Sequence, residues 1–139
     1  MNMKHLKILA AGVLFLMTAV QVQAQKTEEK KPDNPAKCAH IREGKFLRAN
    51  YPEAIWHMII KDNVQTEYFN NGKDYIKSTL VFVDDCNYKA IVLEKSDKND
   101  PAQIGDVFNN KVVATQDNLI KVSSKIEGSE FDMVYIKVK

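Results

Sequence analysis

Short turn motifs recur along this chain and divide most of it into brief segments of β-branched and aromatic residues. Four such motifs are Asp62-Asn63, Asn70-Asn71-Gly72, Asp117-Asn118 and Glu127-Gly128-Ser129. Asn, Asp and Gly tolerate the positive φ angles that tight hairpin turns require. No amphipathic helical stretch exceeds about two turns between these motifs. The pattern therefore predicts antiparallel strands joined by hairpins.

Eight segments have the length and composition of strands. They are residues 44–48, 55–61, 64–69, 75–83, 86–95, 107–115, 119–126 and 131–139. Several have apolar residues on both faces, which a flat sheet with one solvated face does not explain. We therefore predict an all-β fold, an antiparallel up-and-down meander of about eight strands that forms a small closed or partly open barrel. Closure would pair 44–48 with 131–139; an open, curled meander is the alternative, because the first strand is short and contains a glycine.

Residues 1–24 have the basic, apolar and small-residue order that is typical of a secretory signal peptide. Their apolar run, residues 8–20, spans only about 20 Å as a helix, so the alternative of a membrane anchor falls short of the roughly 30 Å hydrocarbon core. Cleavage after Ala24 removes Lys4 and Lys7 and leaves 115 residues with 18 basic and 18 acidic side chains. We predict a periplasmic or secreted protein with no stable membrane span after cleavage. Because the mature chain has no net charge, the sequence does not indicate the positively charged surface that a nucleic-acid partner requires.

The mature chain divides into a leader and one domain. Residues 25–37 are polar, mixed in charge and contain Pro32 and Pro35, which predicts a flexible leader. Residues 38–139 are predicted to form a single β-barrel-like domain. Within it, residues 96–106 make the longest connection, which is expected either as a surface loop or as an arch over one barrel mouth.

Cys38 and Cys86 are the only cysteines of the chain. An even number of cysteines in an exported domain predicts a disulfide. A reactive thiol or a metal ligand is the alternative, but no C-x-x-C motif or zinc-like spacing is present. A bridge between the two residues would contribute about 4 kcal/mol on the chain-entropy model.

The sequence contains no recognisable catalytic, metal-binding or cofactor motif. His40 and His57 have no accompanying nucleophile signature and are interpreted as surface residues. Zinc-protease, dinucleotide and phosphate-loop motifs are all missing. Asp84 and Asp85 are expected to form a turn, with a calcium site as the alternative. We therefore expect a protein that is not an enzyme and has no cofactor and no metal.

Gln65 and Glu67 lie two residues apart and share one face of a predicted strand. They either face water or point inside, where a buried carboxylate and amide require cations, hydrogen-bond donors or a polar ligand. In the second arrangement the predicted ligand-binding residues are Phe46, Trp56, Gln65, Glu67 and Tyr88, which together form a polar patch with apolar walls. The predicted function is binding of a small, partly apolar or lipid-like molecule in a concave sheet. The alternative is an envelope interaction or structural module with a side-chain-filled core.

Three motifs carry a family resemblance. They are Cys38-Ala39-His40-Ile41-Arg42-Glu43-Gly44-Lys45-Phe46, Gln65-Thr66-Glu67 and Cys86-Asn87-Tyr88. The chain resembles a group of small exported β-proteins of Gram-negative bacteria that has no assigned function. Some members have been named topoisomerases by automatic assignment. A mature chain of 115 residues with no net charge leaves no room for an ATPase domain or a DNA gate. Gly44-Lys45-Phe46 is also similar to the G-x-W that begins the first strand of lipocalin-like barrels, which implies that architecture and no particular ligand.

Overall fold

The computed structural model describes residues 29–139. It contains one short 3-10 helix, η1 (Cys38–Ile41), and eight strands. The strands are β1 (Gly44–Arg48), β2 (Trp56–Lys61), β3 (Val64–Phe69), β4 (Asp74–Phe82), β5 (Asn87–Lys95), β6 (Val107–Gln116), β7 (Leu119–Ile126) and β8 (Ser129–Lys137). The predicted signal peptide, residues 1–24, and the first residues of the predicted leader lie outside the described part. Within the described part, no helix is long and apolar enough to cross a membrane.

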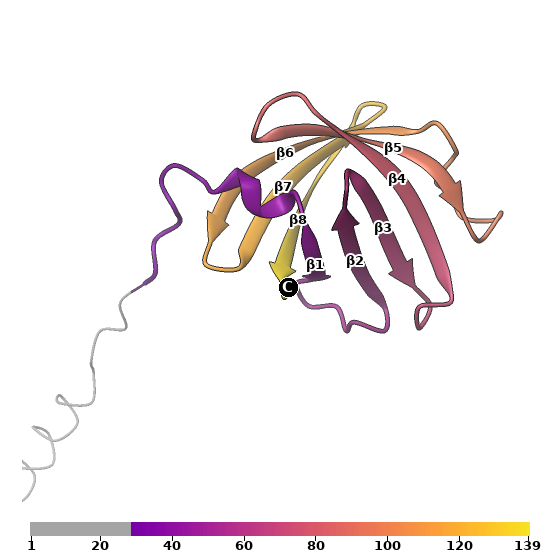
Figure 1. Ribbon diagram of the computed structural model, residues 1–139, viewed down its shortest axis with the longest axis horizontal. Helices are drawn as coiled ribbons and strands as arrows, with labels where there is room; N and C mark the ends of the chain where they lie inside the picture. The colour runs from indigo at the N-terminus through magenta and orange to yellow at the C-terminus, as the bar shows by residue number, and fades with distance from the viewer. Residues whose placement is uncertain (1–28) are drawn as a thin grey trace, which may run out of the picture. The chain divides into compact units, whose positions relative to one another are not determined.

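The eight strands form a closed barrel in which each strand pairs with the next along the chain. The first and last strands complete the ring, with Phe46 opposite Lys137 and Arg48 opposite Tyr135. Figure 1 shows β1 between β2 and β8 at this seam. The all-β meander, its closure and the strand bounds are confirmed, the latter to within two residues.

The hairpin turns have the backbone conformation that their residues predict. Asp62 and Asn63 have φ angles of 52° and 60°, and Asn70 and Asn71 have φ angles of 53° and 56°. Gly128 has a φ of 81°. These positive values are the reason why Asn, Asp and Gly occupy the turns.

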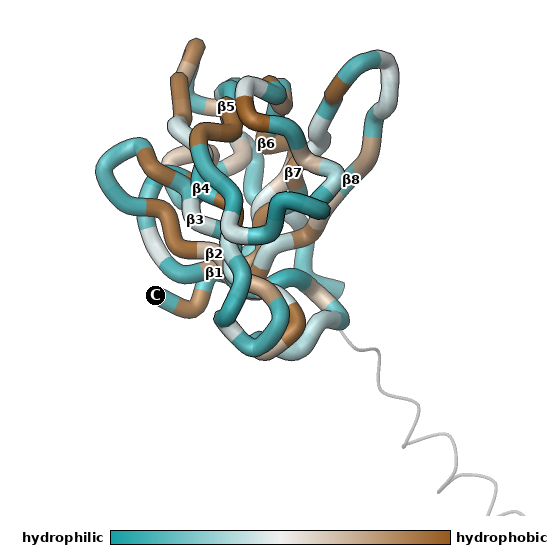
Figure 2. The backbone as a smooth tube through the Cα atoms, turned by 90° about the vertical axis from the view of Figure 1, so that its right-hand side faces the viewer, coloured by the Kyte–Doolittle hydropathy of each residue, from teal (hydrophilic) through white to brown (hydrophobic). Residues whose placement is uncertain are grey.

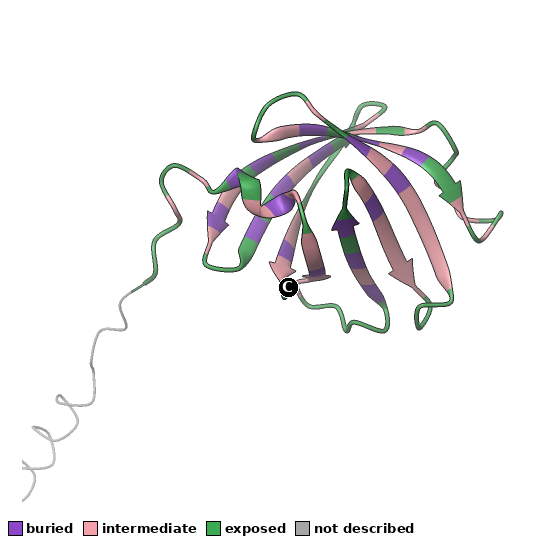
Figure 3. Cartoon of the chain, viewed as in Figure 1, coloured by how far each residue is buried: buried purple, intermediate pink, exposed green. Residues whose placement is uncertain are grey.

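Side chains alternate between the inside and the outside of the barrel, as the period of two in a strand requires. On β2, Trp56, Met58 and Ile60 are buried, whereas the residues between them are more exposed. Figure 3 shows buried positions recurring along the strands, and Figure 2 shows the matching alternation of hydrophobic and hydrophilic segments. The buried apolar side chains form one cluster, which also contains Ile41 of η1. The helix η1 therefore covers the end of the barrel that this cluster fills, which is called the packed end below.

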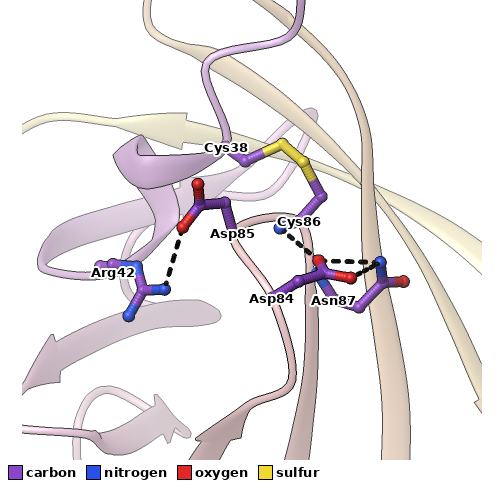
Figure 4. A network of polar contacts seen from close by, with 6 residues as sticks. All are labelled: Cys38, Arg42, Asp84, Asp85, Cys86 and Asn87. Atoms are coloured by element: carbon purple, nitrogen blue, oxygen red, sulfur yellow. Dashed lines mark hydrogen bonds and ion pairs between the residues drawn. A yellow bond between two sulfur atoms is a disulfide. The ribbon is translucent and has the colours of Figure 1, made fainter.

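A disulfide between Cys38 of η1 and Cys86 fastens the helix to the turn between β4 and β5 (Figure 4). Asp84 organises that turn, because its Oδ1 accepts hydrogen bonds from the backbone N–H groups of Cys86 at 2.9 Å and Asn87 at 2.8 Å. Asp85 forms an ion pair with Arg42 at 3.5 Å. The predicted disulfide is confirmed, and Asp84 has the predicted role of a turn former.

Gly44 is the residue that allows the barrel seam to close. Its φ is 138°, and a Cβ atom at this position would collide with the backbone carbonyl of Lys139. The two chain segments are hydrogen-bonded there, since Val138 donates its N–H to the carbonyl of Lys45 at 2.8 Å. The glycine that suggested an open meander is therefore the feature that permits a closed one.

Two β-bulges interrupt the hydrogen-bond ladders between strands. Beyond each bulge, the side chains point to the opposite face from the one that simple alternation predicts. In the β4–β5 pair, Lys77 lies opposite Glu94 and Ser78 opposite Val92, which leaves Leu93 as the extra residue. The β6–β7 pair has a similar shift after Val112. Bulges increase the local bend and twist of a strand, which helps a sheet of this size to close.

The end of the predicted flexible leader contacts β6. Thr115 Oγ1 accepts a hydrogen bond from the backbone N–H of Lys37 at 2.8 Å and donates one to Asp33 Oδ2 at 2.8 Å. The backbone N–H of Asp33 also donates to the carbonyl of Thr115 at 2.8 Å. The chain is therefore held against the barrel from Asp33 onward.

Candidate functional site

A cavity of about 200 Å³ lies inside the barrel, in the half away from η1. β1 shows this arrangement, because it begins at Gly44 next to the packed end and ends at Arg48 in the cavity wall. The polar side chains of the wall are Arg48, Gln65, Glu67, Ser78, Asn110, Ser124 and Tyr135. Its larger apolar side chains are Ile76, Val92, Phe108, Phe131 and Met133. The barrel is thus packed at one end and hollow at the other.

Glu67 is the only carboxylate in this wall. Burial inside the barrel raises the pKa of Glu67, and the negative charge of Asp100 adds to this effect. Hydrogen bonds from Trp56 and Gln65, and the positive charge of Arg48, act in the opposite direction. Since burial is the largest influence, the pKa of Glu67 stays above its ordinary value and the neutral carboxyl group is favoured more than in water.

Arg48 is the positive charge of the cavity wall. Its Nη2 lies 2.8 Å from Met133 Sδ, and its guanidinium lies 5.3 Å from the ring centres of both Tyr51 and Trp56. No carboxylate of the described residues forms a direct ion pair with it. A thioether is a weak hydrogen-bond acceptor. The guanidinium is therefore oriented by aromatic rings, and most of its donor capacity is unused within the wall.

An aromatic stack separates the cavity from the core. Trp56 and Tyr135 stack with their ring centres 5.5 Å apart and an interplanar angle of 9°. The Tyr135 hydroxyl donates a hydrogen bond to Met133 Sδ at 3.2 Å. Burial raises the pKa of Tyr135 well above its ordinary value, so this hydroxyl remains a neutral donor.

Three short polar side chains extend the polar part of the wall, namely Ser78, Asn110 and Ser124. All three are buried, and only 8% of the surface of Asn110 is accessible to solvent. Asn110 Oδ1 is completely buried and has no hydrogen-bond partner. A buried acceptor without a donor costs about 1–3 kcal/mol. This oxygen has too little accessible surface to contact a molecule in the cavity unless the side chain moves.

The loop between β5 and β6 borders the cavity. Lys95 Nζ donates hydrogen bonds to the backbone carbonyls of Asp100 and Ala102, both at 2.8 Å. Ala102 is part of the cavity wall. The 96–106 connection therefore reaches the cavity at Ala102.

The five predicted ligand-binding residues fall into two groups. Gln65 and Glu67 line the cavity. Phe46 and Tyr88 are buried in the core, where Tyr88 stacks on Phe82 with ring centres 5.0 Å apart, so neither forms a cavity wall. Trp56 lies between these groups, because it hydrogen-bonds Glu67 and stacks on Tyr135 without lining the cavity itself.

The sequence contained a usable signal for the polar wall residues that were not predicted. Ser78, Asn110 and Ser124 each lie two residues from a buried apolar residue of the same strand, namely Leu80, Val112 and Val122. A period of two places each of them on the inner face. Extending the alternation outward from each buried run would therefore have identified them.

The remaining candidates do not form a second site. His57 lies on the outer face of β2 and stacks on Tyr68 with ring centres 4.9 Å apart. In the described part of the chain, no three His, Cys, Asp or Glu side chains are grouped so that they could hold a metal ion.

The chain matches no protein-family model, no curated protein and no solved structure. The cavity and its wall are therefore the features from which a function can be inferred.

Proposed function

We propose that this protein is exported and binds a small, partly apolar molecule in the barrel cavity without converting it chemically. The observation that carries the proposal is the 200 Å³ hollow with a mixed wall, in a barrel whose other half is tightly packed. A barrel that served only as a structural module would gain stability from filling this space, since cavities cost free energy. Empty volume next to buried polar groups is typical of a binding site.

The composition of the wall supports a partly apolar guest. Phe108, Phe131 and Ile76 offer apolar surface, whereas the Arg48 guanidinium offers unused N–H groups. A purely apolar ligand would leave those polar groups without hydrogen-bond partners, and a purely polar ligand would leave the apolar surface exposed to water. A molecule with both characters satisfies each part of the wall.

The disulfide supports export. Bridges such as Cys38–Cys86 persist in the periplasm and outside the cell, and are rare in the reducing cytosol. The predicted signal peptide at residues 1–24 points to the same destination.

A ligand screen with a built-in reporter tests the proposal. Trp56 is the only tryptophan of the chain and contacts Glu67 and Tyr135, both in the cavity wall. Binding is expected to change its fluorescence and to add mass to the protein in native mass spectrometry. Small amphipathic molecules are screened first, and envelope lipids serve as the larger probes.

A matched pair of variants separates cavity binding from surface binding. Ala102→Phe places a ring at the cavity wall, whereas Gln103→Phe places the same ring on the neighbouring exposed residue. Ala102→Phe is expected to weaken binding at least tenfold, and Gln103→Phe to leave it unchanged. The proposal would be contradicted if no molecule in the screen binds, or if a ligand binds the Ala102→Phe and Gln103→Phe variants with equal affinity. Either result would favour an interaction module.

A further inference from the structure

We propose that the molecule bound in the cavity is a small organic acid whose carboxylate pairs with Arg48. This inference rests on the proposed function and specifies the chemical class of the ligand. Two features of the wall carry it: an arginine without an anionic partner, and a carboxyl group that does not pair with that arginine.

Arg48 is prepared to receive an anion. The rings of Tyr51 and Trp56 hold its guanidinium in place, and Met133 Sδ is its only hydrogen-bond acceptor among the described side chains. A guanidinium presents five N–H donors in a planar fork that matches the two oxygens of a carboxylate. Charge-assisted pairs of this kind are roughly twice as strong as neutral hydrogen bonds. A carboxylate therefore gains more from this site than a neutral group does.

Glu67 does not fill that role, although it shares the cavity with Arg48. The two side chains form no direct ion pair, and Glu67 is instead hydrogen-bonded by Trp56 and Gln65. Burial disfavours its charged form, whereas an arginine stays charged at any physiological pH. The permanent charge of the wall is therefore positive, which favours an acid over an amine.

The size of the cavity limits the acid to a small one. An apolar protein cavity of 150 Å³ holds a benzene molecule, so about 200 Å³ holds one ring with a few additional atoms. Drug-sized ligands need about 300 Å³ or more. A small aromatic acid thus has the right size and the right charge.

Binding of such an acid is expected to depend on pH through Glu67. The charged or titratable groups that act on Glu67 are Arg48 from β1, Asp100 from the β5–β6 loop, Tyr88 from β5 and Tyr135 from β8. The tyrosines remain neutral because burial raises their pKa values. An ionised Glu67 repels a carboxylate in the same cavity, so affinity for the acid falls as the pH rises and Glu67 ionises.

Three probes with one ring and different head groups test the inference. They are para-hydroxyphenylacetate, its primary amide and tyramine, which carry a negative, a neutral and a positive head group. Each is titrated into the oxidised, mature protein by calorimetry, with Trp56 fluorescence as a second signal. The acid is expected to bind at least tenfold more tightly than either analogue.

Two arginine variants assign the effect to one residue. Arg48→Met removes the charge but keeps much of the side-chain volume, and is expected to weaken binding of the acid at least tenfold and binding of the amide by much less. Arg42→Met removes an arginine at the packed end of the barrel and is expected to change neither. The circular dichroism spectrum of the Arg48 variant, compared with that of the wild type, shows whether the variant is folded.

The outcomes separate the inference from the proposed function. If the amide or tyramine binds as tightly as the acid, or if Arg48→Met does not weaken the acid, the inference is wrong and the proposed function stands. If none of the three probes binds, the inference is also wrong, and the broader screen with Ala102→Phe then decides the proposed function independently.

Discussion

Glu67 is a carboxyl group whose charge the fold disfavours. Its strand partners are Met58 on β2 and Ile76 on β4, so apolar residues flank it on both sides. Burial raises the pKa of Glu67 in the folded protein, whereas the unfolded chain has the ordinary value. Between these two pKa values the folded state binds a proton that the unfolded state has released. The contribution of Glu67 to the free energy of unfolding is therefore largest below the ordinary pKa and falls as the pH rises through the raised pKa.

Glu67→Gln is expected to stabilise the protein at neutral pH by on the order of 1 kcal/mol, the usual size of a stabilising substitution. Glutamine keeps the shape of the carboxyl group and one acceptor oxygen but has no charge to bury. The pH dependence of the free energy of unfolding, measured with urea from acidic to neutral pH, is expected to become flatter.

Glu130→Gln is the matched control, because Glu130 is exposed and lies 3.8 Å from Lys125 in a surface ion pair. Its effect is expected to stay near zero. A Glu67→Gln protein that is less stable than the wild type at neutral pH would show that Glu67 is ionised there and supported by Arg48.

At the level of elements, the loop between β5 and β6 depends on one lysine. The bulge at Leu93 reverses the alternation, so that Glu94 reaches Tyr75 on the outer surface and Lys95 turns to the loop carbonyls. Without the bulge, the ammonium group would not be placed to hold Asp100 and Ala102. A single extra residue in a strand therefore fixes one side of the cavity.

Lys95→Met is expected to loosen this loop. The variant loses charge-assisted hydrogen bonds worth about 1.5–3 kcal/mol each when well formed, so amide hydrogens in residues 99–106 are expected to exchange about tenfold faster or more. Hydrogen exchange with mass spectrometry measures this change. Lys89→Met, an exposed position on the same strand, is the control and is expected to leave the exchange of the loop unaltered. Equal exchange in both variants would mean that the loop holds its position without Lys95.

The elements themselves were largely predictable, whereas the bulges were not. Turn residues such as Asp62-Asn63 need positive φ angles, and this local requirement is visible in the sequence. A bulge adds one residue to a strand without changing its composition, so the sequence around Leu93 and Val113 carries no sign of it. For the same reason the inward position of Thr115, and its contacts with Asp33 and Lys37, did not follow from alternation.

At the level of the whole molecule, the barrel combines a packed end with a hollow end. The sequence predicted the strand number and the closure, because both depend on strand length and turn spacing. The sequence did not decide whether the interior of the barrel is filled by side chains or hollow. That depends on which side chains point inward at each height along the barrel axis. Phe46 and Tyr88 illustrate the problem: their size suggested cavity walls, but they fill the core beside η1.

Removal of the disulfide is expected to affect stability more than binding. The bridge joins residues 48 positions apart, and its loss is expected to lower the free energy of unfolding by up to about 4 kcal/mol. The double variant Cys38→Ala/Cys86→Ala tests this by denaturant unfolding, with the reduced wild type as the comparison. Because the cavity lies in the opposite half of the barrel, ligand affinity of the folded variant is expected to change less than threefold. A larger loss of affinity would mean that the two halves are coupled.

The seam between β1 and β8 also has a consequence for how the polypeptide is made. Pairs such as Phe46 and Lys137 lie far apart along the chain, and contacts of this kind slow folding. While a ribosome is still adding the last strand, the growing chain has unpaired edges at β1 and β7 and no complete barrel. The ring can therefore close only after β8 has been synthesised, and until then both of these edges are open to pairing with another chain.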